Sequence, residues 1–288
     1  MLVPLNIGGC GGSNVDLSNL TNGLNGIHTG NSVVDTIGVG NAASAGAQTV
    51  QTLTFDDQQE ADLGRNVALQ ITTRYGVVDS NQIERYVTLV GLTVADASPR
   101  NDFPYCFAVL NSNKVNAYSG PDGFVMITRG ALAQMRDESE LAGVLGHEIG
   151  HINKHHGAQA VKGAQAKGVL STLTKNVSYV NLFGSASDYA FDVIGNVGFT
   201  EPQELEADAE GVRYAAAAGY NPSGYLHFLQ RMAAVQTGQG APFSTHPGLA
   251  DRATRVADQI NREGLGGKGR TLQARFLENV RLSGSLNQ

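Results

Sequence analysis

The sequence has no long run of apolar residues, no dense run of lysine and arginine, and only two cysteines among 288 residues. A membrane-spanning helix needs about eighteen consecutive apolar residues, so we expect the folded body of the protein to be soluble. The 20 basic and 26 acidic residues give a net charge of −6, and the basic residues are not interleaved with aromatic ones. These absences argue against nucleic acid as a partner. The length allows one large domain or two small ones.

The two cysteines stand in different contexts. Cys106 lies in the apolar stretch 105–110, where we interpret it as a small buried hydrophobic residue in a strand. Cys10 ends the run Ile7-Gly8-Gly9-Cys10, which resembles the bacterial lipobox, where the cysteine becomes the acylated first residue of the mature chain. The residues before it are few and carry no positive charge, so either the start is truncated or the resemblance is accidental. Residues 11–50, rich in Gly, Asn, Ser and Ala, are typical of a flexible tether and favour the lipoprotein.

The rest of the chain is organised around an H-E-x-x-H motif formed by His147, Glu148 and His151. On a helix, two histidines four residues apart lie about 5–6 Å apart on one face, close enough to bind one metal ion. Zinc is the expected ion, because it accepts imidazole nitrogens and can keep one position open for water. Glu148 would lie beside the metal without binding it and take a proton from that water. The alternative is a helix whose histidines only cap or pack.

The sequence around the motif predicts a buried helix. Asp137 and Glu140 have the spacing of a capping box, so the helix is expected to begin at Glu138. An apolar stripe follows, made of Leu141, Val144, Leu145, Ile149 and Ile152. The glycines at 143, 146 and 150 each cost up to about 1 kcal/mol of helix propensity, which indicates that another element approaches this helix closely.

Other patterns predict an α+β fold that is mainly helical, with a small sheet beside the motif helix. Helices are expected over residues 54–75, 80–96, 200–219, 221–236 and 247–262. The hydrophobic period changes to two over 105–110, 114–118 and 124–128, which indicates three short strands of an antiparallel or mixed sheet. Residues 157–199 are expected to form one or two helices with mobile joints that cover the site.

A catalytic zinc of this type needs a third protein ligand, often a Glu on a separate helix. Glu204 and Asp208 lie one helical turn apart, which permits a metal ligand at Glu204 and a second carboxylate at Asp208 that accepts the other ring N–H of a ligand histidine. Glu206 would point away from this face, toward solvent. The extended motif H-E-x-x-H-x-x-G-x-x-H is excluded, because positions 154 and 157 are Lys and Gly.

In combination, these motifs resemble the gluzincin zinc metalloendopeptidases of the HtpX, BepA, LoiP and CaaX prenyl protease group, whose pattern is H-E-x-x-H followed by E-x-x-A-D. The similarity covers most of residues 55–260, including 115–118, 120–130, 140–151, 204–208, 245–247 and 252. The resemblance implies a zincin-like fold, one zinc ion held by His147, His151 and Glu204, and Glu148 as general base. Because the chain lacks spanning helices, it is closer to the soluble envelope branch of the group.

Two further residues of the resemblance have open roles. His246, in a Thr-His-Pro-Gly segment, would stabilise the oxyanion, or move onto the open zinc position and silence the enzyme, or be a surface histidine at a helix start. Arg252 would bind substrate carbonyls or form a surface pair with Asp251 or a Glu. His155 and His156 are interpreted as a solvated helix end, since a side chain two turns from His147 cannot reach the same ion.

The predicted function is a zinc metalloendopeptidase, a hydrolase in which Glu148 activates the metal-bound water. Its catalytic domain would span residues 51–285, after a signal over 1–10 and a tether over 11–50. Substrates would be proteins or peptides bound extended along a sheet edge. By resemblance, these would be misfolded or misassembled proteins of the bacterial envelope, met in the periplasm or at the outer membrane by a chain anchored only through Cys10. Alternatives are a chaperone-like assembly factor with suppressed peptidase activity and, less favoured, a structural zinc domain.

Overall fold

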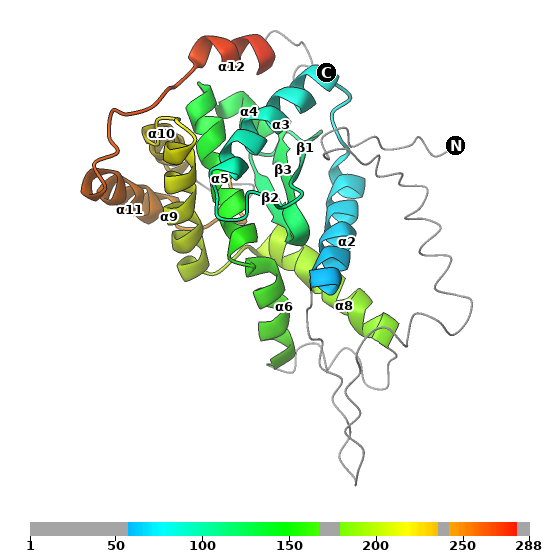
Figure 1. The fold of residues 1–288 in the computed structure, drawn as a ribbon. Coiled ribbons are helices and arrows are strands. Elements are labelled where there is room, and N and C mark those ends of the chain that lie inside the picture. The colour runs from blue at the N-terminus through cyan, green and yellow to red at the C-terminus, as the bar shows by residue number, and fades with distance from the viewer. Residues whose placement is uncertain (1–56, 167–178, 236–241, 281–288) are drawn as a thin grey trace.

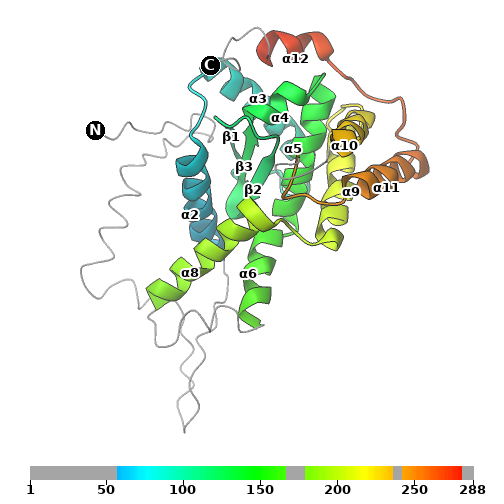
Figure 2. The ribbon, with the colours of Figure 1, turned by 180° about the vertical axis from the view of Figure 1, so that it is seen from behind.

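The computed structural model describes residues 57–166, 179–235 and 242–280, so the predicted signal and tether lie outside the described residues. A mixed three-stranded sheet stands between two groups of helices, as both views show (Figures 1 and 2). The helices are α2 (Asp57–Tyr75), α3 (Asn81–Asp96), α4 (Arg129–Gln134), α5 (Glu138–Asn153), α6 (His156–Ala166), α8 (Tyr179–Asp192), α9 (Glu201–Ala217), α10 (Ser223–Val235), α11 (Leu249–Arg262) and α12 (Gln273–Val280). None of them, within the described residues, has the length and hydrophobicity of a membrane-spanning helix.

The sheet confirms the predicted small mixed sheet beside the motif helix. Its strands are β1 (Cys106–Leu110), β2 (Ala117–Gly120) and β3 (Phe124–Thr128), in the spatial order β1-β3-β2. β1 pairs with β3 in parallel, and β2 pairs with β3 antiparallel, with Ala117 opposite Ile127. β2 is therefore an edge strand. The prediction of a buried Cys106 was wrong, because its side chain at the start of β1 is only half-buried.

The extent of β2 differs from the strand predicted over 114–118, because β2 begins at Ala117 and continues past Tyr118. Ser119 and Gly120 still pair with β3, opposite Val125 and Phe124. The chain reverses only in the short 3-10 turn Pro121–Gly123. This turn is tight because Asp122 and Gly123 adopt left-handed φ angles of 62° and 86°.

The two faces of the sheet bury different cores, as expected for period-two strands. One face, with Phe107, Val109, Val125 and Ile127 among others, packs with α3 and α5. The opposite face, with Ala108, Leu110, Tyr118 and Met126, packs with α2 and α8. The five long helices predicted from periodicity are present with ends within three residues of prediction, whereas the short helices α4 and α12 were not predicted.

The glycines of α5 mark where other helices come closest, as predicted. A Cβ built on Gly146 would lie 2.9 Å from the carbonyl oxygen of Gly211, and one on Gly150 would lie 3.0 Å from that of Ala207, both on α9. A Cβ on Gly143 would lie 2.4 Å from the Cβ of Tyr225 on α10. Backbone contact of this kind brings the first turn of α9 against the histidines of α5.

Candidate metal centre

The centre begins with the fixed end of α5. Asp137 caps the helix as predicted, since its carboxylate accepts a hydrogen bond from the backbone N–H of Glu140 at 3.1 Å. The Glu140 side chain does not complete the expected capping box. It accepts from the backbone N–H of Arg136 at 3.0 Å and pairs with Arg231 of α10. The helix is then buried along its length, with the whole predicted apolar stripe at most 3% exposed.

His147, His151 and Glu204 converge on one point from two helices. The Nε2 atoms of the two histidines lie 3.0 Å apart. Glu204 reaches them from the first turn of α9, with Oε2 at 3.4 Å from His147 Nε2 and Oε1 at 3.5 Å from His151 Nε2. The start of α9 is set by Thr200, whose backbone N–H donates to the side-chain oxygen of Gln203 at 3.1 Å, the capping box predicted here.

His246 joins this group from the loop before α11. Its Nδ1 lies 3.0 Å from Glu204 Oε1 and 3.3 Å from His147 Nε2, and its side chain is buried. One nitrogen or oxygen atom from each of these four residues lies within 4.8 Å of all the others. The interpretation of His246 as a surface histidine was therefore wrong. Its place in the loop leaves both proposed roles at the metal open.

The donor set fits a zinc ion. Imidazole nitrogens and a carboxylate oxygen are the ligands zinc takes in catalytic sites. Glu148 adds an independent observation: it is completely buried, and neither carboxylate oxygen has a hydrogen-bond partner. His246 Nε2 lies 3.5 Å from Glu148 Oε1. A buried carboxylate destabilises the fold unless water or a positive charge lies close to it. A metal cation bound between the four donors, together with a water molecule on it, would supply the charge and the water.

Asp208 takes the position predicted for it. Its Oδ1 lies 2.9 Å from His147 Nδ1, so the ring can donate there and leave Nε2 free for the metal. Tyr225 of α10, which the sequence did not indicate, donates its hydroxyl hydrogen to the same oxygen at 2.6 Å. Burial alone would raise the pKa of Asp208, but Arg252 and His147 hold this pKa below its ordinary value.

The expected surface pair of Arg252 with Asp251 or a Glu is wrong, because Arg252 is buried at 2% exposure and pairs with buried carboxylates. Its Nε and Nη2 donate to the two oxygens of Asp208 at 2.7 and 2.6 Å. Its Nη1 lies 2.6 Å from Glu204 Oε2. Arg252 therefore links the carboxylate that orients His147 with the carboxylate in the donor cluster. It is a positioning residue in this structure.

His156 also differs from prediction, since it is fully buried and not part of a solvated helix end. Its Nδ1 lies 2.8 Å from His151 Nδ1, and its Nε2 lies 3.3 Å from Glu206 on α9. His155, by contrast, is partly exposed and pairs with Glu60 at 2.8 Å. The chain turns at His155, with φ of 55°, and this unpredicted reversal places His156 against His151. His156 thus contacts the second histidine as Asp208 contacts the first.

The surroundings of the centre are closed. Phe199, in the segment between α8 and α9, stacks on the His151 ring with centroids 4.3 Å apart, which agrees with the expected cover. The outward carbonyl of Val115, just before the edge strand β2, accepts the backbone N–H of Phe243 at 2.8 Å. The carbonyl oxygen of Ala117 lies 3.3 Å from His246 Nε2. The cavity beside His151 measures about 10 Å³, room for about one water molecule.

Comparison with known proteins agrees with this geometry. Residues 81–260 match the model of peptidase family M48. Metalloprotease LoiP of Escherichia coli strain K12 is 26% identical over 230 residues, which cover 77% of this chain and 88% of LoiP. The beta-barrel assembly-enhancing protease of Yersinia pestis is 29% identical over 230 residues, 76% of this chain but only 46% of that protein. Metalloprotease YcaL of E. coli strain K12 is 25% identical over 213 residues, 70% of this chain and 76% of YcaL.

Proposed function

Because the chain belongs to peptidase family M48 and is a metalloendopeptidase, we propose that its metal is zinc, held by His147, His151 and Glu204. The observation that carries this proposal is the meeting of these donors within 4.8 Å beside a buried, unpartnered Glu148. A merely structural zinc site would give Glu148 no task, and the burial of an idle carboxylate would only destabilise the fold.

When bound, zinc supplies a Lewis acid that polarises the scissile carbonyl and lowers the pKa of water. The residues of the chain do the rest. Glu148 accepts a proton from the attacking water on one of its free oxygens and returns it to the nitrogen of the leaving amine. Asp208 and His156 keep the rings of His147 and His151 in a fixed orientation. His246, whose Nε2 is 3.5 Å from Glu148, is placed to donate to the developing oxyanion or to act as a fourth ligand.

We propose that substrates are proteins or peptides that bind extended along β2, with misfolded or misassembled envelope proteins as clients. Support comes from the edge position of β2 and from the relatives, one of which is named as an enhancer of β-barrel assembly. The same proposal places the protein in the periplasm, attached to a membrane only through a lipid on Cys10. Labelling of the full-length protein with a radioactive fatty acid, lost in Cys10→Ser, tests the anchor.

The decisive experiment compares casein cleavage by the wild type, Glu148→Gln and His246→Ala, with metal analysis of each protein. We expect one zinc per chain both in the wild type and in Glu148→Gln. Of these two proteins, only the wild type should cleave casein. Cleavage that persists in Glu148→Gln contradicts the role of this residue. A wild type without zinc after purification in zinc-containing buffer contradicts the metal assignment.

A second function is favoured by the closed surroundings of the centre. Backbone groups that a substrate strand would use on Val115 and Ala117 are occupied by Phe243 and His246. A chaperone-like assembly factor that binds clients while its peptidase activity stays suppressed would look like this. Silence of all three proteins in the casein assay, with client binding retained, supports this alternative. Faster cleavage by His246→Ala than by the wild type indicates a suppressed protease.

A further inference from the structure

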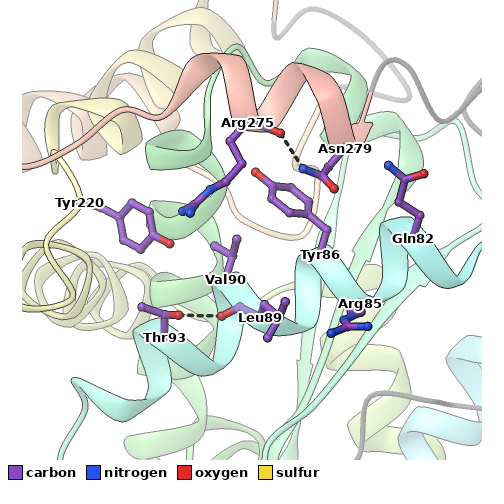
Figure 3. Close-up of a pocket in the computed structure, with 9 residues that line it drawn as sticks. All are labelled: Gln82, Arg85, Tyr86, Leu89, Val90, Thr93, Tyr220, Arg275 and Asn279. Atoms are coloured by element: carbon purple, nitrogen blue, oxygen red, sulfur yellow. Dashed lines mark hydrogen bonds between the residues drawn. The ribbon is translucent and has the colours of Figure 1, made fainter.

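A second concave site lies away from the metal centre, between α3 and α12. It is a pocket of about 340 Å³ lined by Gln82, Arg85, Tyr86, Leu89, Val90, Thr93, Tyr220, Arg275 and Asn279 (Figure 3). Figure 3 shows the Arg275 side chain reaching from α12 between Tyr220 and Tyr86. Behind them lies Glu138, the completely buried first residue of α5. His147 follows nine positions later, so the pocket is about 14 Å from the metal centre along the helix axis.

Three side chains at the back of the pocket bind one buried carboxylate. The hydroxyls of Tyr86 and Tyr220 donate to the Glu138 carboxylate at 2.9 and 2.8 Å, and Arg275 Nε donates to it at 2.6 Å. The hydroxyl hydrogens of the two tyrosines and two of the guanidinium nitrogens of Arg275 are therefore engaged with Glu138. The three side chains leave ring and aliphatic surface, to which Leu89 adds a side chain that is 55% exposed.

The charge at the pocket is one-sided. Among the residues that the structure describes, no acidic side chain lines it, and the charge of Arg275 is balanced by Glu138 behind it. Arg85 at the rim has no hydrogen bond or ion pair with any residue in the described part of the chain. An unpaired guanidinium beside an exposed leucine complements a ligand that carries an apolar group next to a carboxylate.

The apolar surface continues past the pocket. Leu92, one turn beyond Leu89 on the same face of α3, is 40% exposed and does not line the pocket. A volume of about 340 Å³ is at the lower end of small-molecule sites, enough for an anchoring side chain. A ligand that covers the pocket and Leu92 together must be longer than that, which favours a polypeptide segment.

We propose that this pocket is an exosite, a binding surface separate from the catalytic centre, for an acidic amphipathic segment of a partner polypeptide. An apolar side chain of the segment lies on Leu89, and an adjacent carboxylate pairs with Arg85. The partner would be one of the protein substrates named under the proposed function. Only the expectation that the bound partner is then cleaved rests on that function. Binding itself requires neither the metal nor cleavage.

The test measures binding by fluorescence anisotropy in the Glu148→Gln background. The probe is a fluorescein-labelled helical peptide with leucines three and four residues apart and glutamates beside them. We expect Leu89→Ser and Arg85→Glu each to weaken binding about tenfold, the latter with a reversed salt dependence, because salt then screens a repulsion. Val235→Ser and Arg255→Glu are the matched controls, because both residues are exposed on other helices, and these variants should bind as the parent does.

Four results would overturn the exosite. Equal binding of a peptide with lysines in place of the glutamates removes the role of charge. Unchanged affinity in Leu89→Ser and Arg85→Glu places the peptide elsewhere. Concentration-dependent dimers that Leu89→Ser abolishes make the pocket an interface between two copies of the chain. Failure to bind the peptide in a wild type that still cleaves casein refutes the exosite alone, whereas binding without any casein cleavage refutes only the proposed enzyme.

Discussion

The contact between α5 and α9 offers a direct test of how the chain positions its donors. Gly211 of α9 lies against the backbone of α5, so that a Cβ at this position would be 2.6 Å from the His147 nitrogen and 2.9 Å from its Cα. Ordinary van der Waals contact begins at 3.4 Å. In Gly211→Ala the helices must therefore separate locally by about 0.8 Å, the difference between 3.4 and 2.6 Å.

Two opposing terms set the stability of this variant. Alanine in place of glycine stabilises a helix interior by up to about 1 kcal/mol. Overpacking costs about 1–3 kcal/mol, and the clashing atoms of His147 belong to the backbone and cannot rotate away. We expect a net loss of about 1–2 kcal/mol in the free energy of unfolding. Glu204 moves with α9, and since metal sites tolerate distance errors of about 0.2 Å, zinc affinity should fall about 10- to 100-fold.

Gly163→Ala in α6 is the matched control, because a Cβ there meets nothing within 4 Å. It should be as stable as the wild type or up to about 1 kcal/mol more stable, with unchanged zinc affinity. Urea unfolding of the metal-free proteins gives the stability, and competition with a chromophoric chelator gives the affinity. If Gly211→Ala matches the wild type in both measurements, the close contact of α5 and α9 does not position the donors and the reasoning is refuted.

Three more predictions follow from the buried network and the metal. Tyr225→Phe removes the hydroxyl that donates to Asp208, so we expect a loss of about 1 kcal/mol in urea unfolding and a few-fold weaker zinc binding; an unchanged zinc titration would contradict this. Burial would raise the pKa of Glu138, but hydrogen bonds from Arg275 and two tyrosines keep this pKa below its ordinary 4.5. The ionised carboxylate therefore stabilises the fold above that value and loses its contribution as the pH falls through the lowered pKa. Glu138→Gln should cost about 1–3 kcal/mol at pH 7 and progressively less in urea unfolding below pH 4, and a pH-independent cost would count against it. Zinc at about 1,000 times its Kd should add about 4 kcal/mol, raising Tm by about 8–16 °C in both wild type and Glu148→Gln, whereas no shift in calorimetry would deny a specific site.

The sequence predicted correctly those features that depend only on neighbouring residues within one helix or strand. The cap at Asp137, the apolar stripe of α5 and the four-residue spacing of His147 and His151 follow from helix geometry alone. The glycines at 143, 146 and 150 also indicated close neighbours, because their cost in propensity needs a packing reason. The glycines did not indicate which elements those neighbours are, and only the structure identifies them as α9 and α10.

The errors occurred where the partner is distant in the sequence or where a turn lacks its usual residues. The buried partners of Arg252 were not predicted, because nothing in the sequence around it indicates Asp208, 44 positions earlier. His156 was misplaced because a reversal at His155, with positive φ and no glycine, has no sequence signature. The extension of β2 to Gly120 depended on pairing with β3, which competes with turn propensity.

By itself, the sequence determined the core of the chemistry of this protein: two imidazoles four residues apart on one helix, with the Glu148 carboxylate between them, are properties of residue type and helical period. The tertiary structure alone decided which side chains complete and close the centre. Tyr225, Arg252, His156 and His246 reach it from four different segments, and their buried charges and hydrogen bonds exist only after those segments pack. Whether a polar side chain is buried and which group it binds depend on how the chain packs. From sequence alone, such a residue is expected to be exposed to solvent, because its partner is distant in the sequence.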